Sequence, residues 1–233
     1  PGIAYEYGLY KHFLPEINLR EVHDVTLDLI TEENRVVVIT GPEEDGEKTA
    51  EIPEETELTA VLSEAAGKKL SPYRDDVSEE PLMSEKPVPG SVVSETVFPE
   101  IGVHQWRLSN GITVVAKPTT FKNDQVLFTA FSPGGTSQVS DDEYWSAYFA
   151  SSIINTSGLA DFSLVQLEKL LSGENVSVSP YIAELTEGLS GSGSPEDLET
   201  LFKLIHLYIT SPRKDEAAYA SYMKRIRGYI RNR

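Results

Sequence analysis

The stretch "WRLSNGITVVAKPTTFKNDQVLFTAFSPGGTS", residues 106–137, decides the fold because it carries three strand signals in a row. Asn110-Gly111 separates two apolar stretches, which is the strongest short-range signal for a hairpin. The segment "DQVLFTAFS", residues 124–132, predicts a third strand, and the paired glycines Gly134 and Gly135 predict a turn after it. A sheet domain is therefore predicted to begin near residue 103.

The segments after this stretch predict helices and two further strands. Helices are expected near 142–154 and 164–172, and Ser163 with Gln166 forms a capping-box pattern at the start of the second. The stretch at 175–193 predicts two strands. Two helices follow, and the last has apolar side chains along one side, namely Tyr219, Tyr222, Met223, Ile226, Tyr229 and Ile230. Paired strands followed by helices predict an α+β fold, with an antiparallel or mixed sheet and helices packed on one face.

The beginning of the chain is predicted to belong to a different domain. Asn18 and Glu21 form a capping pattern for a helix over about 19–30, and "RVVVIT", residues 35–40, predicts a buried strand. One helix and one strand cannot enclose a core. Residues 1–67 are therefore predicted to be the C-terminal tail of a preceding domain, closed by a short helix over about 54–66.

The segment between these two regions is predicted to be a linker. Residues 68–102 are rich in proline, serine and acidic side chains, and they show no helical periodicity. The predicted organisation is thus a domain tail at 1–67, an acidic interdomain linker at 68–102, and the sheet domain at 103–233.

The charge balance argues against a nucleic-acid partner. The net charge is −17, and residues 1–100 alone carry 23 acidic against 8 basic side chains. A protein that binds the phosphate backbone through a basic face needs the opposite excess. The sequence also contains no apolar run of 18 or more residues, so no membrane span is predicted.

Several compositional features leave the compartment open. There is no cysteine, which excludes disulfides and thiolate metal sites. The composition predicts a soluble protein, and the bacterial periplasm and the cytoplasm are both allowed. The start "PGIAYEYGLY" predicts no signal peptide, and the missing initiator methionine suggests a mature product or an excised piece.

The predicted helix after the glycine pair has no side chain suited to metal binding or proton transfer on its apolar side. Several hydrolases open an active site with a strand, a tight turn and then a helix of this kind. Here the apolar side of that helix carries Ala147, Ala150 and Ser151, and none of these side chains binds a metal or moves a proton well.

On these residues the chain resembles the pitrilysin/insulinase-type zinc metallopeptidases. Their domains open with a similar L-x-N-G hairpin and a strand ending in a small-residue turn, and the next helix bears the zinc motif H-x-x-E-H. The corresponding residues here are "AYFAS", so the two histidine positions match Ala147 and Ser151 and the glutamate position matches Ala150. The family's further glutamate ligand comes from a later helix, and its counterpart here has no carboxylate after Glu216.

The resemblance implies a role without catalysis. Large members of the family have two homologous halves, typically with zinc in the first half only. The chain would then be a truncated, metallopeptidase-like sandwich running from the end of the first half into the inactive second half. It would lack zinc and activity alone, and would supply hinge and chamber wall to the catalytic half of the same polypeptide, which would hold the zinc and cleave the peptide substrate. Two alternatives remain, namely a protein- or peptide-binding module with no protease activity in either half, and an unrelated α+β domain that shares the hairpin pattern.

The resemblance also suggests where peptide would be held. In active members the strand equivalent to 124–132 lies beside the cleft, so Thr129, Phe131, Gly134 and Gly135 are predicted to contact peptide. This holds if the strand lies at a sheet edge, where a peptide can add by main-chain hydrogen bonds. The alternative is a central strand that only fills the core.

Overall fold

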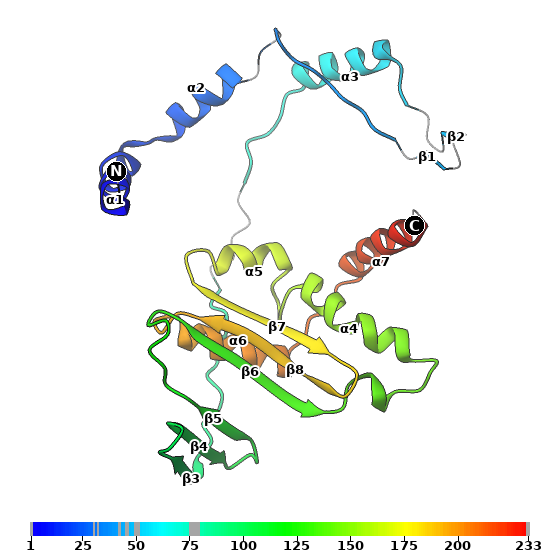
Figure 1. Cartoon of the computed structure of the whole chain (residues 1–233). Helices are drawn as coiled ribbons and strands as arrows, with labels where there is room; N and C mark the ends of the chain where they lie inside the picture. Colours follow the sequence, from blue (N-terminus) through cyan, green and yellow to red (C-terminus); the bar gives the residue numbers. More distant parts are fainter. Residues whose placement is uncertain are drawn as a thin grey trace. The chain divides into compact units, whose positions relative to one another are not determined.

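The computed structural model describes residues 2–29, 31, 33–41, 43–44, 47–48, 52–74 and 80–231. The chain divides into two compact units, Pro1–Ser71 and Pro72–Arg233 (Figure 1). The division falls inside the predicted linker, close to its beginning.

The described residues of the first unit form short elements. Its helices are α1 (Ile3–Phe13), the 3₁₀ helix η1 (Leu14–Glu16), α2 (Leu19–Leu29) and α3 (Glu55–Gly67), and the two-residue strands β1 (Glu43–Glu44) and β2 (Glu47–Lys48) pair antiparallel. None of the three α-helices contains a buried residue. Large apolar side chains on α2, such as Val25 and Leu29, are more than half exposed. These helices therefore present apolar surface that nothing within the described part of this unit covers.

The start of α2 is formed as the sequence predicts. The side-chain oxygen of Asn18 accepts a hydrogen bond from the Glu21 backbone N–H at 3.2 Å, and the Glu21 carboxylate accepts one from the Asn18 N–H at 3.1 Å. Such a reciprocal box satisfies two N–H groups that a helix start otherwise leaves unpaired.

The predicted strand at residues 35–40 was wrong. These residues form no strand in the structure, and Val36 and Val38 are 83% and 77% exposed. A strand requires a neighbour for its N–H and C=O groups, and no other strand among the described residues pairs with this segment. The apolar run is therefore strand-like in composition only.

The second unit contains two three-stranded antiparallel sheets. The first has the order β3–β4–β5, formed by Val92–Phe98, Val103–Leu108 and Thr113–Ala116. The β4–β5 connection is the predicted hairpin at Asn110-Gly111, closed by the Leu108 N–H donating to the Ile112 carbonyl at 2.9 Å. The second sheet has the order β6–β8–β7, formed by Val126–Pro133, Thr186–Gly193 and Val176–Ile182.

Strand β3 corrects the predicted extent of the linker. Its seven residues, Val92–Phe98, lie inside the segment 68–102, yet six of them pair with β4, with a register shift between Val92 and Ser94. Side chains meet across this ladder, as where Glu95 faces Trp106 and the Glu95 carboxylate contacts the His104 ring at 3.4 Å. Cross-strand pairs of this kind stabilise β3 as a third strand. The composition of residues 68–102 gives no sign of this strand, because the pairing depends on β4.

An earlier part of the predicted linker is also packed. The Lys169 ammonium donates to the Tyr73 hydroxyl at 2.8 Å and lies 5.4 Å from the centre of its ring. Leu82 and Met83 pack against the hydrophobic core. We call residues 80–86 the strap. The strap is attached to the second unit rather than forming a free tether.

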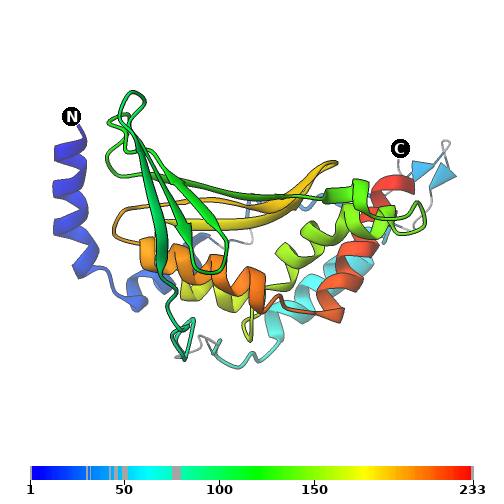
Figure 2. The same ribbon diagram turned by 90° about the horizontal axis from the view of Figure 1, so that it is seen from below.

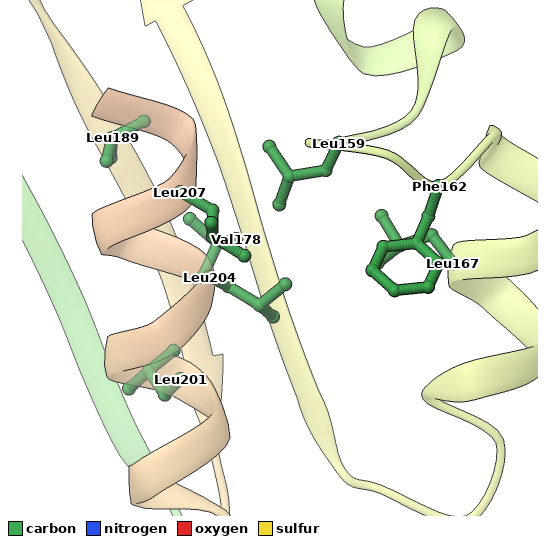
Figure 3. Close-up of a cluster of buried hydrophobic side chains, with 8 residues drawn as sticks. All are labelled: Leu159, Phe162, Leu167, Val178, Leu189, Leu201, Leu204 and Leu207. Carbon is green, nitrogen blue, oxygen red and sulfur yellow. The ribbon is translucent and has the colours of Figure 1, made fainter. Parts of the chain in front are cut away.

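Helices lie on one face of the second sheet (Figure 2). They are α4 (Tyr144–Ser157), α5 (Leu164–Leu170), α6 (Leu198–Thr210) and α7 (Glu216–Arg231). Helices α4 and α6 pack directly on β7. The core between helices and sheet, shown in Figure 3, is formed by Leu159, Phe162, Leu167, Val178, Leu189, Leu201, Leu204 and Leu207. The predicted α+β class, with helices on one face of an antiparallel sheet, is confirmed.

The start of α6 predicts an acid-sensitive contribution to stability. The Asp197 carboxylate accepts hydrogen bonds from the Ser194 hydroxyl at 2.7 Å and from the Asn175 N–H at 2.9 Å, and these bonds lower the pKa of Asp197 below its ordinary value. A lowered folded-state pKa stabilises the fold above the unfolded-state pKa, and this stability is lost as pH falls through the folded-state value. The stability difference between the wild type and Asp197→Asn, measured by urea unfolding, should therefore shrink as the pH falls from about 6 to about 3. A difference that stays constant over this range would contradict the assignment.

Candidate functional site

The three positions of the missing zinc motif lie together on α4. Ala147, Ala150 and Ser151 are spaced so that they share one side of the helix, and all three are half-buried. Two methyl groups and one hydroxyl offer no imidazole or carboxylate to a zinc ion. These residues do not fit zinc, and we derive no metal chemistry from them.

The helix that would supply the further ligand packs against α4 through aromatic rings. The Tyr222 ring of α7 is buried and meets the Phe149 ring of α4 edge-on, with 6.2 Å between their centres. The Arg225 guanidinium lies 5.3 Å from the centre of the Tyr222 ring. The one carboxylate of α7 is Glu216, which is exposed in its first turn. The contact between α4 and α7 thus includes aromatic side chains that pack together, Phe149 and Tyr222.

No alternative metal centre is formed by the part of the chain that the structure describes. Within those residues, no group of three or more histidine, cysteine, aspartate or glutamate side chains is close enough to hold an ion. In the same residues, no helix is long and apolar enough to cross a membrane.

The predicted peptide-contact residues separate into two groups. Thr129 and Phe131 lie on β6 with exposed side chains, and the Phe131 side chain is 72% exposed. Gly134 and Gly135 are buried, and the Gly134 N–H donates to the Leu185 carbonyl at 3.0 Å. A Cβ on Gly135 would collide with the Ala183 carbonyl oxygen. The two glycines bring the end of β6 against the β7–β8 turn.

The position of β6 within its sheet is that of an edge strand. It pairs with β8 from Val126↔Gly193 to Pro133↔Thr186, and no strand among the described residues pairs with its other side. The alternative of a central strand is thus contradicted for this chain.

A pocket that sequence reasoning missed lies under the strap. It has a volume of about 480 Å³ and is lined by the strap together with the Phe162 and His206 regions. Its lining includes three acidic residues, Glu80, Glu85 and Asp161. The pocket could not be predicted because the strap was predicted to be part of a free linker, and its composition does not indicate that Leu82 and Met83 pack on the core.

Comparisons with known proteins agree on a protease lineage. No family model matches the chain. Over 226 residues it is 28% identical to a protein of Arabidopsis thaliana named zinc protease PQQL-like, covering 95% of this chain and 21% of that protein. Over 228 residues it is 23% identical to the Haemophilus influenzae protein named "Probable zinc protease PqqL", covering 97% of this chain and 24% of that protein. The chain therefore spans about a fifth to a quarter of the length of these curated relatives.

Solved structures lead to the same group. The ferredoxin protease FusC, solved in complex with Arabidopsis ferredoxin, aligns with a TM-score of 0.57 at 25% identity, over 79% of this chain and 21% of FusC. The periplasmic protease PqqL from Escherichia coli shares the fold, with a TM-score of 0.59 at 21% identity, over 74% of this chain and 19% of PqqL. The resemblance inferred from the sequence is confirmed: the chain is homologous to a segment of the PqqL-like zinc proteases of the pitrilysin/insulinase family.

Proposed function

We propose that this chain is a non-catalytic segment of a zinc-protease homologue, and that it contributes a hinge and part of the substrate-chamber wall. The observation that carries the proposal is the composition of α4. The helix stands directly after the strand and glycine turn, but Ala147, Ala150 and Ser151 replace the ligands and the base. A segment that keeps this scaffold without its chemistry is suited to hold substrate rather than to cleave it.

The hinge role is supported by how the chain divides. The proposed organisation keeps the tail at 1–67, the linker at 68–102 and the peptidase-like domain at 103–233, with the strap and β3 added to the domain. The boundary between the two compact units after Ser71 favours a hinge near that residue.

The partners follow from the same proposal. The catalytic half of the same polypeptide would hold zinc and cleave the peptide, and this segment would hold none. A protein or peptide substrate is supported by FusC, which was solved in complex with a protein, ferredoxin. Thr129 and Phe131 are the proposed contacts, because both side chains are exposed on the edge strand β6.

A second candidate is a binding module with no protease activity in any half. The presence of Ala147, Ala150 and Ser151 in place of the ligands and the base favours it equally. The remainder of the polypeptide separates the two: an intact H-x-x-E-H motif there supports the chamber-wall role, and its absence supports the binding module.

The metal prediction tests the absence of chemistry directly. The purified chain should retain no stoichiometric zinc after dialysis, because α4 offers no imidazole or carboxylate at the three motif positions. Elemental analysis checks this, and about one zinc per chain would contradict the proposal. The same preparation should show no chelator-sensitive cleavage of an unstructured peptide.

Restoring the motif should not restore the enzyme. The variant Ala147→His, Ala150→Glu, Ser151→His regains two ligands and a base but lacks the further carboxylate, because α7 presents Tyr222 at its contact with α4. We expect weak zinc binding at most and no peptidase activity above the wild-type background. The control is Ala147→Gln, Ala150→Gln, Ser151→Gln, which adds similar bulk without ligands. Chelator-reversible cleavage by the histidine variant alone would show that the rest of the site survives.

A further inference from the structure

Five aromatic rings form a continuous row from the first turn of α4 to α7. They belong to Tyr144, Trp145, Tyr148, Phe149 and Tyr222, and neighbouring ring centres are separated by 5.0 Å to 6.2 Å. The row is buried at its α7 end and open at the other, where the Trp145 and Tyr148 side chains are 63% and 51% exposed. We call the open end, Tyr144, Trp145 and Tyr148, the aromatic patch. Large aromatic side chains that stay exposed together mark an interaction surface.

The buried end of the row already holds a cation. The Arg225 guanidinium lies 5.3 Å from the centre of the Tyr222 ring. The face of an aromatic ring attracts a cation electrostatically, and tryptophan gives the strongest contact of this kind. Among the described residues, no lysine or arginine lies over the Trp145 ring. The exposed end of the row thus presents the ring best suited to a cation, and no described residue supplies one.

Acidic side chains directly precede the aromatic patch. Asp141, Asp142 and Glu143 form the turn that enters α4, and all three are exposed. The Tyr144 N–H donates to the Asp141 carbonyl at 3.4 Å, so a helix-like turn connects the acids to the rings. Side chains three or four positions apart on such a turn are neighbours, which brings Asp141 near Tyr144 and Trp145. None of the salt bridges among the described residues involves these three acids. The aromatic patch therefore lies in a negative field that favours a positively charged partner.

We infer that the aromatic patch binds an arginine-bearing segment of another protein, with a guanidinium stacked on the Trp145 ring and hydrogen-bonded to the carboxylate of Asp141 or Asp142. Arginine fits better than lysine, because its planar guanidinium can stack on an aromatic face while its edge donates hydrogen bonds to a carboxylate. A second copy of the chain is disfavoured as the partner, since two chains of net charge −17 repel each other. The inference goes beyond the proposed function, which gives no charge for the partner and places its contacts on β6, and it does not depend on that function.

The experiment measures binding of a fluorescein-labelled peptide, Gly-Arg-Gly-Arg-Gly-Arg-Gly, to the whole chain by fluorescence anisotropy. Trp145→Ala should weaken binding by about fivefold, the effect of one exposed cation–π contact. Asp141→Asn with Asp142→Asn should weaken it by about threefold or more, through two lost charge contacts. Both variants should melt at the wild-type temperature, because the changed side chains are exposed. The same peptide with citrulline in place of each arginine keeps the shape without the charge, and it should bind about tenfold more weakly or worse.

The matched control for the acidic pair is Glu168→Gln with Glu196→Gln. It removes the same number of charges from exposed positions outside the patch. Its affinity for the peptide should change by less than about twofold, because charges far from the bound guanidinium are screened by salt.

A second readout follows the ring itself. The chain has two tryptophans, so Trp106→Phe leaves Trp145 as the one indole that emits. Its emission should change as unlabelled peptide is added, with the same midpoint as the anisotropy. This readout decides the question if Trp145→Ala lowers the melting temperature.

Several results would overturn the inference. They include absence of binding by the wild type, unchanged affinity in a folded Trp145→Ala variant, and unchanged Trp145 emission. Equal binding of the citrulline peptide would mean that no cation is recognised. Equal weakening by the control pair at Glu168 and Glu196 would mean that the net charge of the chain, rather than the aromatic patch, attracts the peptide. A dimer, seen by analytical ultracentrifugation, that Trp145→Ala dissociates would identify a second copy of the chain as the partner instead.

Discussion

Gly135→Ala is expected to destabilise the second unit by about 3 kcal/mol or more, enough to unfold a marginal domain. Gly135 has a φ of +72°, in the left-handed region that an alanine enters at a cost. The new Cβ would also collide with the Ala183 carbonyl oxygen, and backbone atoms of Glu184 and Thr186 lie 2.9 Å from its position. The β7–β8 turn would have to move, which breaks the bond between the Thr136 N–H and that carbonyl. Urea unfolding should show a lower midpoint at an unchanged slope.

Gly173→Ala is the matched control for this effect. Gly173 also has a positive φ, +94°, but nothing lies within 4 Å of the position its Cβ would occupy. It should therefore show only the conformational cost, about 1 kcal/mol. Equal destabilisation by the two variants would mean that the close approach of the β7–β8 turn to Gly135 contributes nothing.

Signals confined to a few neighbouring residues predicted structure well. Ser163 and Gln166 form the expected capping box, with the Ser163 N–H donating to the Gln166 side chain at 3.0 Å. Asn110-Gly111 forms the expected hairpin turn, in which Gly111 adopts a φ of +89°. In both cases the chemistry that fixes the conformation lies within four residues, so the sequence contains all of it.

Features that depend on distant partners could not be predicted in the same way. The run at 35–40 has strand composition but finds no pairing strand among the described residues, whereas β3 has linker-like surroundings and pairs with β4. The edge position of β6 depends on β8 lying beside it, and β8 begins more than fifty residues later in the chain, at Thr186. Strand order is a property of tertiary packing, and neither periodicity nor propensity encodes it directly.

The candidate site shows the same difference between features that local sequence predicts and features that depend on distant partners. That Ala147, Ala150 and Ser151 share one side of a helix follows from their spacing alone. Gly134 and Gly135 were predicted to contact peptide, but small residues at a turn serve equally to admit a ligand or to admit a neighbouring backbone. Only the hydrogen bonds to the β7–β8 turn identify the second use.

Hydrogen exchange should separate the two units by a large factor. The amides of Val36–Ile39 lie in no strand or helix, so they should exchange at rates close to those of an unstructured peptide. Amides of Leu189 and Gly191, in the central strand β8, should exchange slower by a factor on the order of 10³ or more, since opening them requires unfolding of the sheet. Exchange detected by NMR at single residues, in a monomeric sample, measures this ratio.

The same experiment resolves the direction of each amide in β6. The Ala130 carbonyl oxygen lies against Gly188 of β8, so Phe128 and Ala130 direct their N–H groups toward β8 and should be protected, whereas Leu127 and Thr129 should exchange quickly. Uniform protection along β6 would contradict the open edge, and slow exchange at Val36–Ile39 would show that this apolar segment is already covered within the monomer. Fast exchange there, beside an alternating pattern in β6, would agree with both assignments, because residues 35–40 form no strand and β6 is an edge strand of its sheet.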